Sequence, residues 1–209
     1  SRVPMGSNRS IHGEAFGWMV AERYEMTSQG EAAERLCDQW ELGREDLDAF
    51  AVESHRRACA AASAGHFEKE IVPVPVMQVR EKGAEGEAHL FSADETIRPG
   101  TAVEKLATLK TSFRADGRLT AGNSSQISDG AAGLLLMSSV KARSLGLKPR
   151  ARILAMTTVG SDPTLMLTGP VAATRKVLAQ AGLTLDDIDL FEINEAFASV
   201  PLVWMKELG

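Results

Sequence analysis

Positive charge, aromatic side chains and cysteine are all scarce in this 209-residue chain. Its net charge is -5 at pH 7, and aromatic residues make up 5% of the composition. Nucleic-acid binding depends on cations that neutralise phosphates and on aromatic rings that stack on bases, so we expect no nucleic-acid partner. No apolar run approaches the roughly 20 residues that span a bilayer, and "SRVPMGSNRS" has no signal-peptide pattern. We therefore expect a cytoplasmic protein with no membrane partner.

The cysteines and histidines form no metal-binding or redox pattern. Cys37 and Cys59 lack CxxC spacing and lie inside helical patterns, which favours small apolar core residues over nucleophiles. The histidines are scattered without ligand spacing, so we expect no metal site and assign them no role in a site. They are His12, His55, His66 and His89.

The borders of the chain are unusual for a native protein. It has no initiator methionine, and it stops on "KELG", the last turn of an expected helix. We expect an internal segment of a longer protein or a trimmed chain.

Residues 27–65 show a helical pattern interrupted once, at "ELGRED". Thr27 and Ser28 are possible N-caps of the first helix, whose apolar residues recur at i, i+3, i+4 and i+7. The second helix is expected to stop at Gly65. The sequence predicts a helical pair here.

Two short strands and a short helix are expected next. "EIVPVPVMQV" contains Pro73 and Pro75, which cannot donate to a sheet, so it predicts an edge strand or an extended connection. "EAHLFSADE" predicts a short strand. "TAVEKLATL" predicts a helix that begins with a capping box formed by Thr101 and Glu104.

Residues 131–209 alternate between strand-like and helix-like segments. The expected strands are "AAGLLLMS", "ARILAMTTV" and "IDLFEI", and each is followed by a helical pattern. Ser138 or Ser139 can cap the first helix, and Pro201 is expected to kink or break the last. Strand and helix units in succession predict parallel strands and an α/β fold.

Asn194 lies directly after the last expected strand. Ligands collect at the carboxyl ends of parallel strands, so the Asn194 side chain could face a ligand crevice. Asn is also among the best N-caps, and spacing alone favours a capping role. The residues themselves leave both interpretations open.

Several motifs taken together resemble the thiolase family. They occur in the family's order along essentially the whole chain, from "SRVPMGS" at the start to "NEAFA" near the end. The others are "LDAFAVESHRRACAAASAGHFEKEIVPV", "RPGTAVEKLATLKTSFRADGRLTAGN", "TAGNSSQISDGAAGLLLMS" and "GPVAATRKVLAQAGLTLDDIDLFEINEAF".

The resemblance implies a thiolase-like α/β fold of two βαβαβαββ halves, with a mostly helical loop domain inserted in the first. Residues 1–125 then correspond to the loop domain. Residues 126–148 correspond to the strand and helix that return to the N-terminal half, and residues 149–209 to the start of the C-terminal half. The βα layers of both halves are expected to be partial, which would expose sheet edges and apolar surface.

The resemblance also implies a reaction. Thiolases transfer an acyl group between a 3-oxoacyl-CoA or acetyl-CoA and coenzyme A through an acyl-cysteine, with coenzyme A as cosubstrate and no other cofactor. Acyl-CoA is therefore the expected ligand, and a homodimer or homotetramer is the expected assembly. A fixed amide can help to stabilise a thioester oxyanion without titrating, and by similarity Asn194 would do so by holding a water molecule.

The same matching assigns substrate-binding residues. Ala121 and Ser125 would contact the pantetheine arm, Phe113 would line its channel, and Arg98 would lie near the nucleotide end. Ala196 and Phe197 would form walls of the acyl pocket. The alternatives are that Phe113 is a core residue, Ser125 a turn former and Arg98 a solvated charge.

The chain departs from the family pattern at important points. The family's nucleophilic cysteine precedes the matched segment, and its "GHP" histidine and "CxGGG" cysteine follow it, while Cys37 and Cys59 match neither cysteine motif. We expect no turnover from this chain alone. The residues aligned with the "HMG" of some thiolases read "TSQG", which leaves acyl-chain preference open.

Two other functions remain possible from the sequence. A thiolase-like module could bind acyl-CoA without cleaving it. A generic nucleotide-binding α/β domain is a weaker candidate, because "GNSSQISDG" is neither GxGxxG nor a P-loop and leads into an expected strand.

Overall fold

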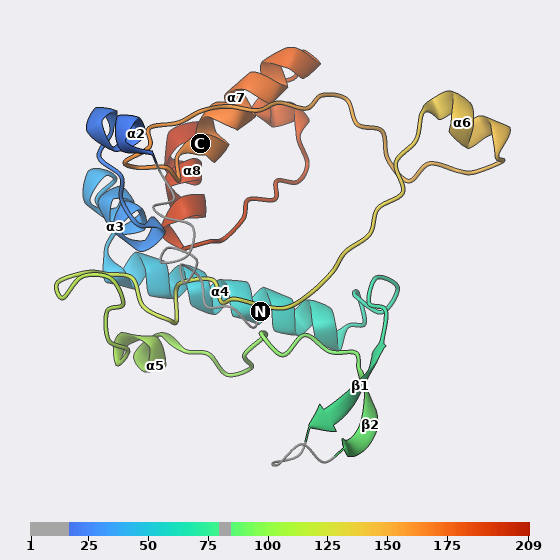
Figure 1. The fold of residues 1–209 in the computed structure, drawn as a ribbon, viewed down its shortest axis with the longest axis horizontal. Helices are drawn as coiled ribbons and strands as arrows, with labels where there is room; N and C mark the ends of the chain where they lie inside the picture. The colour runs from blue at the N-terminus through green and yellow to red at the C-terminus, as the bar shows by residue number, and fades with distance from the viewer. Residues whose placement is uncertain (1–16, 80–84) are drawn as a thin grey trace.

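The computed structural model describes residues 17–79 and 85–209, so "SRVPMGS" and His12 lie outside the described residues. Figure 1 shows α3, α4, α7 and α8 gathered in one helical body, with α6 and the hairpin of β1 and β2 standing away from it. The helices are α2 (Trp18–Arg23), α3 (Gln29–Gln39), α4 (Arg44–Ser63), α5 (Val103–Ala107), α6 (Ser139–Ser144), α7 (Gly169–Ala181) and α8 (Ser199–Leu208). A 3-10 turn spans Leu185–Asp187, and the strands are β1 (Val74–Val79) and β2 (Glu85–Phe91).

The helical pair predicted over residues 27–65 is confirmed as α3 and α4. Ser28 is the N-cap of α3, and its hydroxyl accepts a hydrogen bond from the Glu31 N–H at 3.2 Å. Beyond α4, Gly65 has a φ of +73°, a left-handed conformation that suits glycine after a helix.

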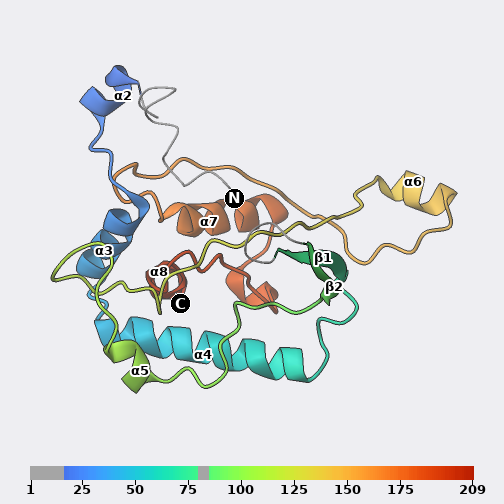
Figure 2. The same ribbon diagram turned by 60° about the horizontal axis from the view of Figure 1, so that its bottom comes forward.

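The core lies where α3 and α8 pack together. Ala33, Leu36 and Cys37 of α3 are fully buried, and Val203 of α8 is nearly so. Figure 2 shows α4 running beneath this pair. The remaining buried members of the core cluster are Leu42, Leu47, Leu119, Phe197, Ala198 and Val200.

The hairpin confirms the two strands expected near residues 70–94. β1 and β2 pair antiparallel, with Val74 opposite Phe91 and Pro75 opposite Leu90. Among the described residues this is a two-stranded sheet, so Pro75 lies on an edge strand, where a missing N–H can be tolerated.

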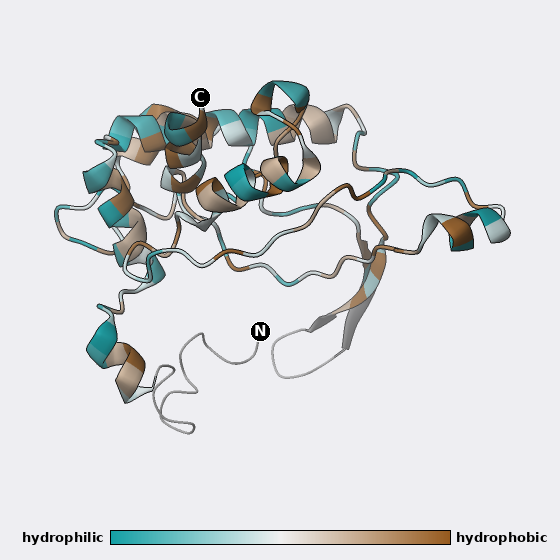
Figure 3. Cartoon of the chain, turned by 90° about the horizontal axis from the view of Figure 1, so that it is seen from above, coloured by the Kyte–Doolittle hydropathy of each residue, from teal (hydrophilic) through white to brown (hydrophobic). Residues whose placement is uncertain are grey.

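The predicted parallel sheet is not formed by the described residues. Residues 131–138, 151–159 and 188–193 carry the three expected strands, and none of them belongs to a strand in the structure. Leu134 is 90% exposed and Leu190 is 89% exposed. A strand buried on both faces needs neighbours on either side, and no described segment lies in register with these runs. Figure 3 shows apolar stretches along the extended chain outside the helical body.

The helix starts follow the prediction in part. The Ser138 hydroxyl accepts a hydrogen bond from the Lys141 N–H at 3.2 Å, which confirms Ser138 as the N-cap of α6. The predicted capping box of α5 is wrong, because Ala102 occupies the N-cap and the Thr101 hydroxyl donates instead to the Arg98 carbonyl at 2.8 Å.

The last helix also differs from the prediction. α8 begins at Ser199, with Ala198 at its N-cap, several residues later than the sequence predicts. Pro201 therefore neither kinks nor breaks the helix. It stands in the first turn, where a backbone N–H would have no partner within the helix.

Candidate functional site

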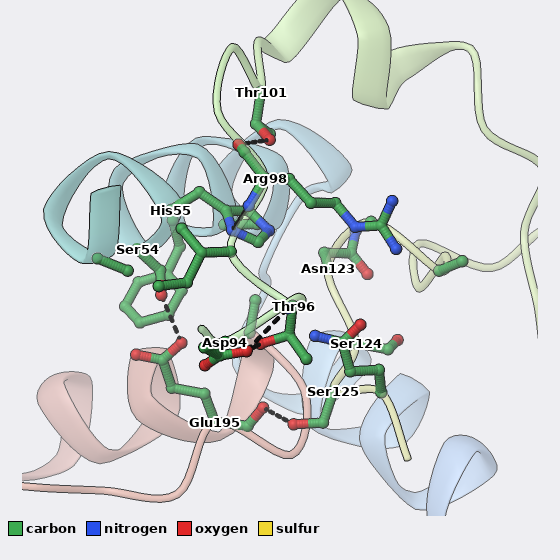
Figure 4. Close-up of a pocket in the computed structure, with 18 of the residues that line it drawn as sticks. Ser54, His55, Asp94, Thr96, Arg98, Thr101, Asn123, Ser124, Ser125 and Glu195 are labelled. Atoms are coloured by element: carbon green, nitrogen blue, oxygen red, sulfur yellow. Dashed lines mark hydrogen bonds between the residues drawn. The ribbon is translucent and has the colours of Figure 1, made fainter. Parts of the chain in front are cut away.

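A groove of about 1020 Å³ opens between α4, the segment 94–101, α5 and the loop 121–128. Its volume matches the upper end of the range of about 300–1,000 Å³ that is typical of small-molecule sites. Figure 4 shows polar side chains from these separate segments facing one space. Among its lining residues are Phe50, Ser54, His55, Asp94, Arg98, Lys105, Leu106, Leu109, Ala121, Ser125 and Glu195.

The loop that carries Ala121 and Ser125 is joined to the segment before α8. The Ser125 N–H donates to the Ala196 carbonyl at 2.9 Å, and the Ala198 N–H donates to the Asn123 carbonyl at 2.9 Å. Between these bonds, Ser124 and Phe197 form an isolated antiparallel bridge. The Ser125 hydroxyl donates to the Glu195 carbonyl at 2.7 Å. Ser125 is therefore exposed at the groove with a fixed orientation.

Arg98 lies at the groove on the segment that follows the hairpin. Its backbone N–H donates to Nδ1 of His55 at 3.3 Å, which attaches this segment to α4. The Arg98 side chain is exposed and forms no ion pair with any residue that the structure describes. Figure 4 shows it extending across the side of the groove on which Asn123 lies. An unpaired guanidinium at the edge of a groove can receive an anionic group.

Ser54 and Glu195 face each other across the groove. The Ser54 hydroxyl donates to Oε2 of Glu195 at 2.8 Å (Figure 4). This contact links α4 to the "NEAFA" motif. Ser54 was not singled out from the sequence, and His55 was assigned no role in a site, yet both line the groove. The available signal was two adjacent polar residues on a helix with an apolar face.

Phe113, Ala196 and Phe197 lie beside the groove and are not among its lining residues. The rings of Phe113 and Phe197 meet edge to face, with centroids 5.7 Å apart. Phe197 is buried in the core cluster, whereas Phe113 is 45% exposed and lies over Gly30 of α3. The structure thus brings Arg98, Ala121 and Ser125 into one groove and places the other three behind its wall.

Asn194 does not stand where the sequence predicts. The residues before it form no strand, and α8 begins only at Ser199, so Asn194 neither ends a strand nor caps a helix. It is exposed, and its side chain makes no hydrogen bond to another described residue. Its neighbour Glu195 reaches the groove instead.

Two buried carboxylates hold the loop that leads into the groove. Glu34 of α3 accepts hydrogen bonds from the backbone N–H groups of Arg118 and Leu119 at 2.9 Å each. Asp48 of α4 accepts one from the Asn123 side-chain amide at 2.8 Å. Sequence reasoning missed both carboxylates and Asn123. The available signal was acidic residues on the apolar faces of α3 and α4.

An exposed ion-pair network strengthens the same region. Arg114 pairs with Glu31 at 2.6 Å and with Asp38 at 2.7 Å, and Arg118 pairs with Asp38 at 2.6 Å. Hydrogen bonds from Arg114 and then Arg35 lower the pKa of Glu31 to about 2. The network attaches the 111–120 segment to α3.

Neither cysteine is placed as a nucleophile in the groove. Cys37 is fully buried in α3, and burial raises its pKa to about 11, so the thiol stays protonated near neutral pH. Cys59 lies in α4 and lines a separate, smaller cavity of about 590 Å³.

Across residues 17–79 and 85–209 no cluster of His, Cys, Asp and Glu is suited to hold a metal ion. No helix in the described part of the chain has both the length and the apolar character to cross a membrane.

Comparison with known proteins identifies the family of the chain. The family model described as "Thiolase, N-terminal domain" matches residues 6–140, and the one described as "Thiolase, C-terminal domain" matches residues 147–209. The chain is 50% identical over 208 residues to a 3-ketoacyl-CoA thiolase of Cronobacter sakazakii, covering 99% of this chain and 52% of that protein. It is 47% identical over 192 residues to an acetyl-CoA acetyltransferase of Pseudomonas aeruginosa, covering 92% of this chain and 47% of that protein.

The crystal structure of the Bacillus anthracis acetyl-CoA acetyltransferase aligns with a TM-score of 0.82 and 41% identity, covering 95% of this chain and 51% of that one. The fold is thus one that mixes helix and sheet in the manner of the acetyl-CoA acetyltransferases. The chain belongs to the thiolase family. It spans about half the length of the curated relatives that it matches. The domain boundaries near residues 125 and 148 stay predictions.

Proposed function

We propose that this chain forms the coenzyme A-binding part of a thiolase, which transfers an acyl group between a 3-oxoacyl-CoA or acetyl-CoA and coenzyme A through an acyl-cysteine. The observation that supports the proposal most is the convergence of Arg98, Ala121 and Ser125 on one groove. Arg98 comes from a different segment than the loop that carries Ala121 and Ser125, and the family resemblance assigns all three residues to the same ligand. Coenzyme A is then a cosubstrate, and the reaction needs no metal ion.

The groove fits the two chemical parts of the ligand. The exposed Arg98 guanidinium can pair with a phosphate of the nucleotide. Ala121 leaves room for a narrow arm beside it. The Ser125 hydroxyl donates to the Glu195 carbonyl, so its oxygen lone pairs are free to accept a hydrogen bond from an amide N–H of the pantetheine arm.

We also propose that Asn194 holds a water molecule against the thioester oxygen. Its exposed carboxamide has no partner among the described residues and can donate to such a water. In the proposed enzyme, Phe113 lines the arm's channel, and Ala196 and Phe197 form walls of the acyl pocket. We further propose a cytoplasmic homodimer or homotetramer, supported by the exposed apolar side chains of residues 134–136 and 153–156.

Titration calorimetry of the 209-residue chain with coenzyme A tests the binding. Saturable binding is expected, and Arg98→Ala is expected to weaken coenzyme A more than pantetheine, which has no nucleotide. Arg143→Ala, an exposed arginine of α6 away from the groove, is the matched control. Absence of saturable binding by the unaltered chain would overturn the proposal.

The second candidate is a thiolase-like module that binds acyl-CoA without cleaving it. It is favoured by one observation, that neither cysteine lines the groove. A thiolysis assay of the isolated chain with acetoacetyl-CoA is expected to show no turnover in either case. Trapping of an acyl-cysteine when the remaining family motifs are supplied on the same polypeptide would support the enzyme, and binding without acylation would support the module.

A further inference from the structure

The side chains of Asp48 and Asn123 form a buried polar pair, in which Asn123 lines the groove and Asp48 does not. Asp48 is 1% exposed and Asn123 is 4% exposed. Nδ2 of Asn123 donates to Oδ1 of Asp48 at 2.8 Å, while Nε of Arg44 donates to Oδ2 of the same carboxylate at 2.7 Å. A buried carboxylate is costly to desolvate unless its oxygens are paired. Both oxygens of Asp48 have a donor, so the pair is a stable and strongly oriented feature.

Asn123 fixes the loop through every polar group that it has available. Its Oδ1 accepts from the Thr120 N–H at 2.8 Å, and its Nδ2 also donates to the Arg118 carbonyl at 3.2 Å. Its main-chain carbonyl accepts from the Ala198 N–H at 2.9 Å. One residue therefore joins α4, the 118–125 loop and the start of α8.

Arg44 extends the network to α5 and the residues that follow it. Its Nη2 donates to the Leu106 carbonyl and, at 3.3 Å, to the Leu109 carbonyl. Leu106 and Leu109 line the groove, as do Ala121 and Ser125. The Arg44–Asp48–Asn123 network thus joins α5 to the 121–125 loop, and both line the same groove.

We propose that Asp48 and Asn123 are positioning residues that hold the 121–125 wall in the geometry needed to bind coenzyme A. The inference rests on the proposed function, because it assumes that the groove is the coenzyme A site. The role requires no contact of either side chain with the ligand. Ala121 and Ser125 each lie two residues from Asn123, so loss of the Asn123 side-chain bonds frees the stretch of backbone that carries both.

An exchange of the two side chains tests the pair. Asn123→Asp sets two carboxylates against each other where a 2.8 Å hydrogen bond stood. Asp48→Asn combined with Asn123→Asp restores a donor and an acceptor between the two positions, while the bond to the Arg118 carbonyl is lost and the Arg44–Asp48 ion pair becomes a hydrogen bond to a neutral amide. We expect Asn123→Asp to raise the Kd for coenzyme A about tenfold or more, and the exchanged pair to recover to within about threefold of the unaltered chain.

The measurement is calorimetric Kd, taken below the melting temperature of each variant so that only folded protein is compared. Asp46→Asn serves as the control for lost stability, because Asp46 caps the same helix by accepting from the Gly43 N–H at 2.7 Å and does not line the groove. It is expected to lower Tm without changing Kd. A raised Kd in Asn123→Asp beside an unchanged Kd in Asp46→Asn distinguishes positioning from a general loss of stability, and recovery in the exchanged pair assigns the effect to the bond between positions 48 and 123.

The possible failures are separable. If the unaltered chain does not bind coenzyme A, the proposed function fails, and this inference fails with it. If the unaltered chain binds and Asn123→Asp binds equally well, or if the exchanged pair is no better than Asn123→Asp, the inference alone is overturned.

Discussion

Oε1 of Glu34 accepts a hydrogen bond from the Leu119 backbone N–H at 2.9 Å, although the two residues are 85 positions apart in the sequence. Both residues are fully buried. The carboxylate occupies the space beside Gly117, where a Cβ would overlap Oε1 and lie 3.1 Å from the Arg114 carbonyl oxygen. A carboxylate held by backbone N–H groups cannot move aside without losing those bonds.

Gly117→Ala is therefore expected to destabilise the fold. The added methyl group has to displace either Glu34 or the backbone, and overpacking of this kind costs about 1–3 kcal/mol. Chemical denaturation of the 209-residue chain measures the change in the free energy of unfolding. Gly160→Ala is the control, because nothing lies within 4 Å of a Cβ at that position. Equal stability of the two variants would show that Glu34 does not hold the loop as described.

Stability is expected to fall in acid through the ion pairs of Glu31. Its pKa is lowered from an ordinary value of 4.5 to about 2, so folding favours the ionised form. The stabilising contribution is complete above pH 4.5 and is lost as the pH falls towards 2. Thermal unfolding followed between pH 7 and 3 should show Tm decreasing below 4.5. The decrease should be smaller in Glu31→Gln than in Glu104→Gln, which alters an exposed carboxylate of α5.

The two cysteines should differ sharply in reactivity. With a pKa of about 11, Cys37 is buried and protonated. Only about one part in ten thousand would be thiolate at pH 7, even with full access. A disulfide reagent applied to the native chain should modify Cys59 first, and denaturation should release the second thiol. Rapid labelling of native Cys59→Ser at Cys37 would contradict the described packing of α3.

The exposed apolar run of residues 134–136 should promote self-association. Leu134 is 90% exposed, Leu135 79% and Leu136 69%, and extended chain with unpaired backbone groups is a template for pairing. Leu134→Lys is expected to reduce concentration-dependent light scattering by the chain. Gln180→Lys adds the same charge at an exposed position of α7 and should reduce it less. A chain that stays monomeric at high concentration without either change would refute this expectation.

Local sequence signals predicted the helices well and the sheet poorly. Ser28 and Ser138 act as N-caps, and Gly65 and Gly182 follow helices in left-handed conformations, because these features depend on neighbours within a few residues. The run around Leu135 has the composition of a buried parallel strand, but such a strand exists only when other strands flank it. Composition alone does not report whether those partners are present.

The residues of the candidate site were likewise predicted only in part. The resemblance identified Arg98, Ala121 and Ser125, which meet at the groove. It did not identify Asp48 or Asn123, since their contact depends on how α4 packs against a loop 75 residues away. The Thr101 capping box failed for a local reason instead. The carbonyl of Arg98, three residues earlier in the chain, competes for the Thr101 hydroxyl.

Backbone hydrogen bonds join Ser125 to Ala196 and Asn123 to Ala198, and they restrict motion between the two segments. Residues 123–125 fall in the stretch matched by the N-terminal thiolase model, and residues 196–198 fall in the stretch matched by the C-terminal one. Two backbone hydrogen bonds of 2.9 Å oppose a hinge motion between the two matched regions at this contact. The Arg98 segment is held to α4 by a longer bond, from the Arg98 N–H to Nδ1 of His55 at 3.3 Å, so a shift of that segment would change the shape of the groove at lower cost.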